Sequence, residues 1–87
     1  MSAHRLTIRF SAWLYEQTAT GFQHEVIRAL KRAGYHVVSQ RGSHVKLYNP
    51  DTEITLVIPN HREVDRWTLK GILKDAEISV EQFIKLL

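Results

Sequence analysis

The sequence contains no cysteine, and it has only two prolines and four glycines among its 87 residues. Without cysteine the protein cannot form disulfide bonds, use a thiolate nucleophile or hold zinc through sulfur ligands. No apolar stretch approaches the roughly 20 residues that a membrane-spanning helix needs, and the N-terminus lacks the apolar run of a secretory signal. We therefore expect a cytoplasmic protein, without membrane contact, that folds without covalent cross-links.

Length and composition indicate one small globular domain. Hydrophobic residues make up 44% of the chain and charged residues 24%, which suits one core but not two. The net charge of +3 is unevenly distributed: five basic and no acidic residues lie between Val26 and Pro50, against five basic and seven acidic ones from Asp51 to Leu87. One part of the surface is therefore suited to a polyanion such as RNA, although such charges also serve simply to solvate a surface.

The first 20 residues differ from the rest of the chain. Leu6–Phe10 alternates like a short strand, and Ser11–Tyr15 has no clear period. We leave residues 1–20 as an N-terminal extension without an assigned role. The folded domain is placed at residues 21–87.

The domain is expected to begin with a helix. Thr20-Gly21-Phe22-Gln23 has the spacing of a capping box, and Gly34 is a natural stop residue. Between them, apolar residues recur on one helical stripe, which consists of Phe22, Val26, Ile27, Leu30 and Ala33.

Three strands and two further helices should follow. Period-two alternation predicts strands over Tyr35–Gln40, His44–Tyr48 and Glu53–Ile58, joined by turns at Arg41–Ser43 and Asn49–Thr52. Asp65 can cap a helix in which Leu69, Ile72 and Leu73 share a face and Trp67 packs at the start. Ser79–Gln82 is a second capping box, opening a terminal helix that buries Val80, Phe83, Ile84 and Leu87.

The resulting order, α-β-β-β-α-α, predicts an α+β, two-layer fold. A three-stranded antiparallel sheet gains most burial when the helices cover one of its faces and leave the other face open. Val45 and Leu47 must then face the helices, which turns His44, Lys46 and Tyr48 toward solvent. In the third strand Ile54, Leu56 and Ile58 face inward and Thr55 faces outward.

The outward residues of the second strand suit metal-free cleavage of RNA. An imidazole, whose pKa as a class lies near neutrality, can take the proton of a ribose 2′-OH as that oxygen attacks the adjacent phosphorus. His44 fits this role, while Arg41 or Lys46 can balance the charge on the phosphorane and Tyr48 can stack on a base. Gly42 and Ser43, in the preceding turn, offer backbone and hydroxyl donors.

Each of these residues also has an ordinary structural interpretation. An exposed histidine is more often a surface residue than a catalyst, and we treat His4, His24 and His36 as structural or incidental. His44, His61 and a carboxylate of Asp51 or Glu53 could be drawn as a metal site, but the chain lacks ligand spacing such as H-x-x-x-H. We expect no metal ion and, without a Gly-rich phosphate loop, no nucleotide cofactor.

From about Glu25 to Leu87 the chain resembles the HicA family of bacterial mRNA-interferase toxins. The resemblance lies in the order and spacing of Leu30-Lys31-Arg32-Ala33-Gly34-Tyr35, Arg41-Gly42-Ser43-His44, Ile58-Pro59-Asn60-His61 and Thr68-Leu69-Lys70-Gly71-Ile72-Leu73-Lys74. Trp67 and Glu77 stand where the family usually has glycine, and the spacing between Arg41 and Gly42 is shorter than in the family pattern.

The resemblance implies a fold like that of a double-stranded-RNA-binding domain and metal-independent cleavage of mRNA, with growth arrest as the result. It implies His44 as the catalytic residue, and a cognate HicB-type antitoxin that covers it. We expect Arg41, Gly42, Ser43, Lys46 and Tyr48 to contact RNA, with His61 as a second RNA contact or a general acid. Operator DNA is expected to be contacted only through the antitoxin complex.

Two other functions fit the same pattern. A non-catalytic double-stranded RNA-binding module would use the same fold and basic face, and its affinity for RNA would survive loss of His44. A protein-interaction domain would show no salt-dependent affinity for RNA at all.

Overall fold

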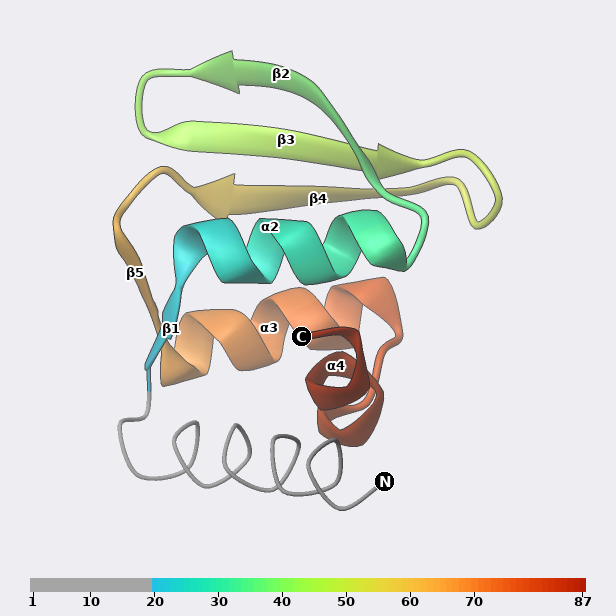
Figure 1. Ribbon diagram of the computed structural model, residues 1–87. Helices are drawn as coiled ribbons and strands as arrows, with labels where there is room; N and C mark the ends of the chain where they lie inside the picture. The colour runs from blue at the N-terminus through green and yellow to red at the C-terminus, as the bar shows by residue number, and fades with distance from the viewer. Residues whose placement is uncertain (1–19) are drawn as a thin grey trace.

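The structure is a computed structural model that describes residues 20–87, so the expectations for the segments Leu6–Phe10 and Ser11–Tyr15 lie outside the described residues. Its elements run along the chain as shown in Figure 1: β1 (Thr20–Phe22), α2 (Gln23–Arg32), β2 (His36–Arg41), β3 (His44–Asn49), β4 (Ile54–Pro59), β5 (Glu63–Asp65), α3 (Arg66–Ala76) and α4 (Val80–Leu86). None of the described helices is long and apolar enough to cross a membrane.

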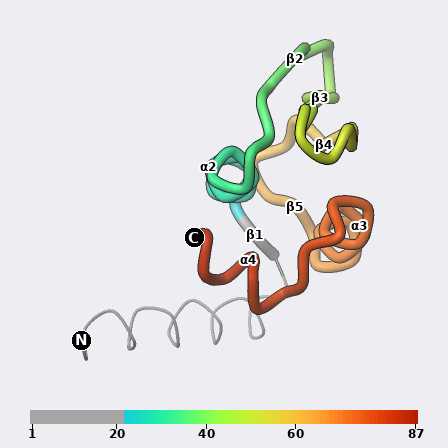
Figure 2. Tube along the Cα trace, turned by 90° about the vertical axis from the view of Figure 1, so that its right-hand side faces the viewer, coloured from blue at the N-terminus to red at the C-terminus, as the bar shows by residue number. Residues whose placement is uncertain are grey.

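The predicted α+β architecture is confirmed. Strands β2, β3 and β4 form a three-stranded antiparallel sheet in that order, and helices α2 and α3 lie on one side of it (Figure 2). One hydrophobic core joins this sheet, β5 and the three helices, and consists of Val26, Ala29, Leu30, Tyr35, Val45, Leu47, Leu56, Ile58, Val64, Leu69, Ile72, Leu73, Ala76 and Phe83. We call the other side of the sheet, turned away from the helices, the open face.

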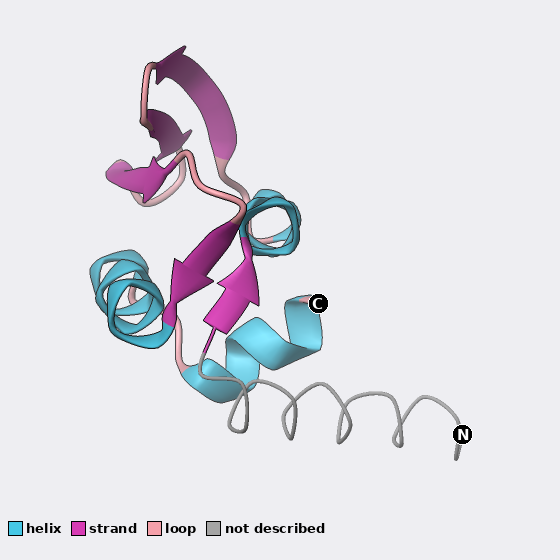
Figure 3. Cartoon of the chain, turned by 90° about the vertical axis from the view of Figure 1, so that its left-hand side faces the viewer, coloured by secondary structure: helices cyan, strands magenta, loops and turns pink. Residues whose placement is uncertain are grey.

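A second, two-stranded sheet was not predicted. Strand β1 pairs with β5 in antiparallel register, visible as two short arrows between the helices (Figure 3). The capping box predicted at Thr20 is therefore wrong, because this segment pairs as a strand and Phe22 becomes the N-cap without a side-chain hydrogen bond. The Gln23 side chain points to the loop after β4 instead, where its Nε2 donates to Pro59 O at 3.2 Å.

The other predicted helix ends are confirmed. The Asp65 carboxylate accepts hydrogen bonds from Thr68 N and from Thr68 Oγ1, each at 2.9 Å. These hydrogen bonds hold the pKa of the Asp65 carboxyl below its usual value. Ser79 and Gln82 form the complete capping box of α4. Gly34 ends α2 with a φ of 106°, a conformation that L side chains rarely adopt.

Several residues expected in the core lie at the surface. Trp67 is 75% exposed, because the first turn of α3 leaves its ring outside the core, where it lies beneath the cationic groups of Arg66 and Lys70. Phe22, at the end of β1, is 42% exposed. In the terminal helix only Phe83 is fully buried, Ile84 is half-buried, and Val80 and Leu87 are exposed.

Candidate RNA-binding and cleavage site

His44 opens strand β3 at the edge of the open face. Along β3 the side chains alternate as predicted, with Val45 and Leu47 buried and His44 and Lys46 exposed. Tyr48 is half-buried. The outward orientation of the histidine follows from period-two alternation, since a one-residue shift in register would turn Val45 and Leu47 out of the core.

A β-bulge in strand β2 brings two further side chains onto the same face. His36 and Arg41 are five residues apart, so in a regular strand they would point to opposite faces. The register shifts between Val37 and Ser39, which makes Val38 the extra residue of the bulge. As a result His36 and Arg41 both pair with outward-facing residues of β3.

The open face is therefore built of three cross-strand rows. Arg41 and Pro59 flank His44 in the first row, and Ser39 and Val57 flank Lys46 in the second. In the third row, His36 and Thr55 flank Tyr48. None of these nine side chains is acidic, so the face carries the positive charge of Arg41 and Lys46 without a neighbouring carboxylate in the same rows.

The turn before His44 brings a hydroxyl close to the imidazole. Gly42 has a φ of 51°, as a tight two-residue hairpin turn requires, and Ser43 completes the turn. Ser43 Oγ lies 3.4 Å from His44 Nδ1, at the long end of hydrogen-bonding distance. The other ring nitrogen, Nε2, has no part in this contact.

Asn60 ties this turn to the rest of the domain. Its backbone N–H donates to Ser43 O at 2.7 Å, and its side-chain Nδ2 donates to Gly42 O at 3.1 Å. Its Oδ1 accepts from Gln23 Nε2 at 3.1 Å, which links the turn to the first residue of α2. The position of His44 is thus set by three elements rather than by the hairpin alone.

The family model for the HicA toxin of bacterial toxin-antitoxin systems matches residues 24–78. The match covers more than half of the chain and includes every residue of the three rows. The chain belongs to the HicA toxin family. A toxin of a toxin-antitoxin system has a cognate antitoxin as its partner. No curated protein matches the chain.

Six of the seven site residues expected from the sequence lie together in this HicA domain. Arg41, Gly42, Ser43, His44, Lys46 and Tyr48 occupy one turn and one face of one hairpin. The seventh, His61, is exposed in the loop after β4, two residues beyond the strand partner of His44.

Sequence reasoning missed Asn60, Gln23 and His36. Asn60 stands inside the Pro-x-His motif, which was the only signal for it, and Gln23 was assigned to the capping box. From the sequence alone, His36 is interpreted as structural or incidental. The bulge places it on the open face, and alternation alone does not reveal that bulge.

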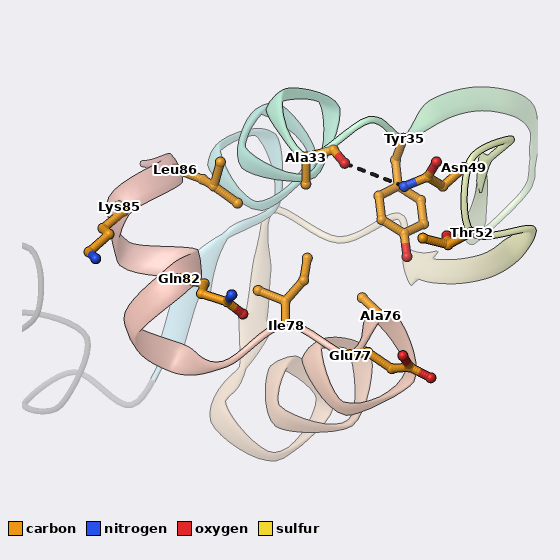
Figure 4. Close-up of a pocket in the computed structure, with 10 residues that line it drawn as sticks. All are labelled: Ala33, Tyr35, Asn49, Thr52, Ala76, Glu77, Ile78, Gln82, Lys85 and Leu86. Carbon is orange, nitrogen blue, oxygen red and sulfur yellow. Dashed lines mark hydrogen bonds between the residues drawn. The ribbon is translucent and has the colours of Figure 1, made fainter.

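A cavity of about 460 Å³ lies at the opposite end of the HicA sheet, beside the β3–β4 turn (Figure 4). Tyr35 and Asn49 line it together with residues at the ends of the helices. The Tyr35 hydroxyl is buried and has no hydrogen-bond partner among the residues that the structure describes, although Thr52 lies beside it. Burial, the larger effect, raises the pKa of the Tyr35 phenol, while Thr52 acts in the opposite direction.

Proposed function

We propose that this HicA toxin is a metal-independent endoribonuclease that cleaves mRNA with His44 and thereby inhibits translation and growth. The position of His44 carries the proposal. Its imidazole is exposed at the edge of a face without acidic residues in its rows, directly across from Arg41 and one row from Lys46. A ribose and its phosphate can approach from solvent.

In this mechanism His44 acts as the general base. It removes the proton of a ribose 2′-OH, the 2′ oxygen attacks the adjacent phosphorus, and the bond from phosphorus to the 5′ oxygen breaks. The products are a 2′,3′-cyclic phosphate and a 5′-hydroxyl. The departing 5′ oxygen must gain a proton, and His61, exposed on the loop that follows β4, is our candidate donor.

Ser43 can select the reactive form of the imidazole. In the tautomer that carries its hydrogen on Nδ1, the ring donates to Ser43 Oγ across the 3.4 Å contact, and Nε2 is free to accept a proton. Arg41 and Lys46 would stabilise the negative charge that grows on the phosphorane oxygens, a type of interaction that contributes about 3 to 4 kcal/mol in other enzymes. Tyr48 would contact a base.

The antitoxin partner is expected to be of the HicB type and to cover His44. A protein that presents acidic side chains would complement the positive open face and exclude RNA from it at the same time. Contact with operator DNA would then come from the antitoxin rather than from this chain.

Cleavage assays with two histidine variants test the proposal. His44→Ala should abolish cleavage of RNA and growth inhibition while changing the thermal transition little, because an exposed side chain contributes little stability. His24→Ala, which removes an exposed imidazole from α2, is the matched control and should cleave normally. Addition of EDTA should have no effect on the wild-type enzyme.

The fold itself favours one alternative, a non-catalytic double-stranded RNA-binding module. Purified wild-type protein would then leave RNA intact, and His44→Ala would change only the affinity. Cleavage that persists in His44→Ala, or that requires added magnesium or zinc, would refute the proposed mechanism.

A further inference from the structure

We infer that His36 and Tyr48 form a stacking platform for one unpaired base of the substrate, so that the RNA lies as a single strand along β3. This inference rests on the proposed function, because it assumes that RNA binds the open face. It adds a recognition site, at the far end of the same face, that includes a residue outside the family motifs.

The two rings belong to one cross-strand pair. His36 lies directly opposite Tyr48 in the register of β2 and β3, and paired Cβ atoms on one face of an antiparallel sheet are about 4.5 to 5.5 Å apart. His36 is exposed and Tyr48 is half-buried, so both side chains present part of their surface to solvent on the open face. Adjacent aromatic rings on a sheet are the usual means of stacking unpaired bases.

The platform and the reactive group are separated along the strand. His44 and Tyr48 are four residues apart along β3, a distance of about 13 Å at the rise of an antiparallel strand. A base stacked on the platform therefore belongs to a neighbouring nucleotide and not to the one whose 2′-OH is attacked. Between the two sites lies the row of Lys46 and Ser39, whose ammonium and hydroxyl groups suit the connecting phosphate.

The bulge at Val38 makes this arrangement possible. Without the extra residue, either His36 or Arg41 would point to the helix side of the sheet, and the open face would lose either the platform or the cation beside His44. A base that is already stacked and paired in a duplex cannot occupy the platform. The geometry thus favours single-stranded RNA over duplex RNA.

Binding of an uncleavable oligonucleotide tests the platform. The cut site is first mapped with the wild-type enzyme, and a single-stranded RNA with 2′-deoxyribose at that site is then titrated to obtain Kd. We expect His36→Ala to weaken binding about 5- to 150-fold, the range that corresponds to loss of one base–aromatic stack. His36→Phe should restore affinity, whereas His36→Lys, which keeps a cation but no ring, should not. His24→Ala is the control.

Abasic substitution identifies the partner of the platform. One abasic position beside the cut site should weaken wild-type binding about as much as His36→Ala does, and the two changes together should cost little more than either alone. The inference is overturned if His36→Ala binds like wild type, if no abasic position is coupled to it, or if a duplex of the same sequence binds more tightly. Cleavage by the wild-type enzyme together with any of these results would leave the proposed function intact. If the wild type does not cleave, that function is refuted, and the same variants and abasic positions are then tested on the unmodified single-stranded RNA.

Discussion

The two ends of strand β3 are both fastened by an asparagine, but the two residues have opposite surroundings. Asn49, at the C-terminal end, is 4% exposed; its Nδ2 donates to Ala33 O and its Oδ1 accepts from Asp51 N. Asn60, beside the N-terminal end, is exposed and holds the turn that precedes His44. Similar chemistry therefore stabilises the fold at one end and positions the candidate site at the other.

Burial explains why the two asparagines should differ in their effect on stability. The hydrogen bonds of Asn49 are part-buried, so loss of one leaves a partner that water reaches less easily, whereas a bond lost at the surface is replaced by one to water. The Asn49 side chain is also closely packed against Gly34, because a Cβ added to Gly34 would lie 3.2 Å from Asn49 Nδ2. The comparison predicts that mutation of Asn49 mainly affects stability and mutation of Asn60 mainly affects activity.

The largest change in stability is expected for Asn49→Ala. It removes the hydrogen bond to Ala33 O at the end of α2 and the one from Asp51 N within the β3–β4 turn, and should lower the free energy of unfolding by about 1 to 3 kcal/mol. Chemical denaturation monitored by circular dichroism measures this loss. An unchanged denaturation midpoint would show that the buried asparagine does not hold this end of the sheet.

Asn60→Ala should reverse this pattern. The free energy of unfolding should fall by less than about 1 kcal/mol, because the side chain is exposed. The turn then loses its side-chain link, His44 is less well positioned, and kcat should fall about tenfold while KM changes little. Steady-state cleavage of a defined oligonucleotide separates the two constants. A rise in KM at constant kcat would instead make Asn60 an RNA contact.

Tyr35→Phe provides a smaller test at the buried end. Burial raises the pKa of the phenol in the folded state above its ordinary value of 10.0. The stability that this difference contributes is fully present below pH 10.0 and is lost as the pH rises through the pKa of the folded state. The variant should show a flatter decline of stability above about pH 10. Near neutrality stability should change little, because the hydroxyl has no hydrogen-bond partner within residues 20–87. Thermal unfolding between neutral and alkaline pH measures this difference, and identical alkaline profiles would contradict it.

The smallest effect is expected at Asp65, where the exposed carboxylate caps α3. Its pKa is lowered in the folded state, so the stability it contributes is present above its ordinary value of 3.8 and is lost as the pH falls through the lower folded value. Asp65→Asn should therefore lose the acid-dependent part of this contribution while it keeps a capping oxygen. Acid titration of both proteins, followed by circular dichroism, should show a shallower acid transition in the variant.

Local patterns were sufficient to predict much of the fold and part of the site. The alternation of β3 predicted that His44 and Lys46 face solvent, and the cap at Asp65 and the capping box at Ser79 were found from their spacing. These features depend on neighbouring residues, so a short stretch of sequence contains the information.

Features that depend on distant pairing could not be predicted in this way. Strand β1 is only three residues long and exists because it meets β5 from the other end of the domain. The bulge at Val38 depends on the registration of two strands, and the role of Asn60 depends on a turn far from it in sequence. Trp67 fits a helical pattern, but it lies on a first turn that the core does not cover.

Analysis of the RNA ends produced by the purified toxin tests the central claim most directly. If the imidazole of His44 activates a ribose 2′-OH, the wild-type enzyme in EDTA should leave 2′,3′-cyclic phosphate and 5′-hydroxyl ends, and a 2′-deoxy substitution at the cut site or His44→Ala should prevent cleavage. Products with 3′-hydroxyl and 5′-phosphate ends, or cleavage of the 2′-deoxy substrate, would contradict the account.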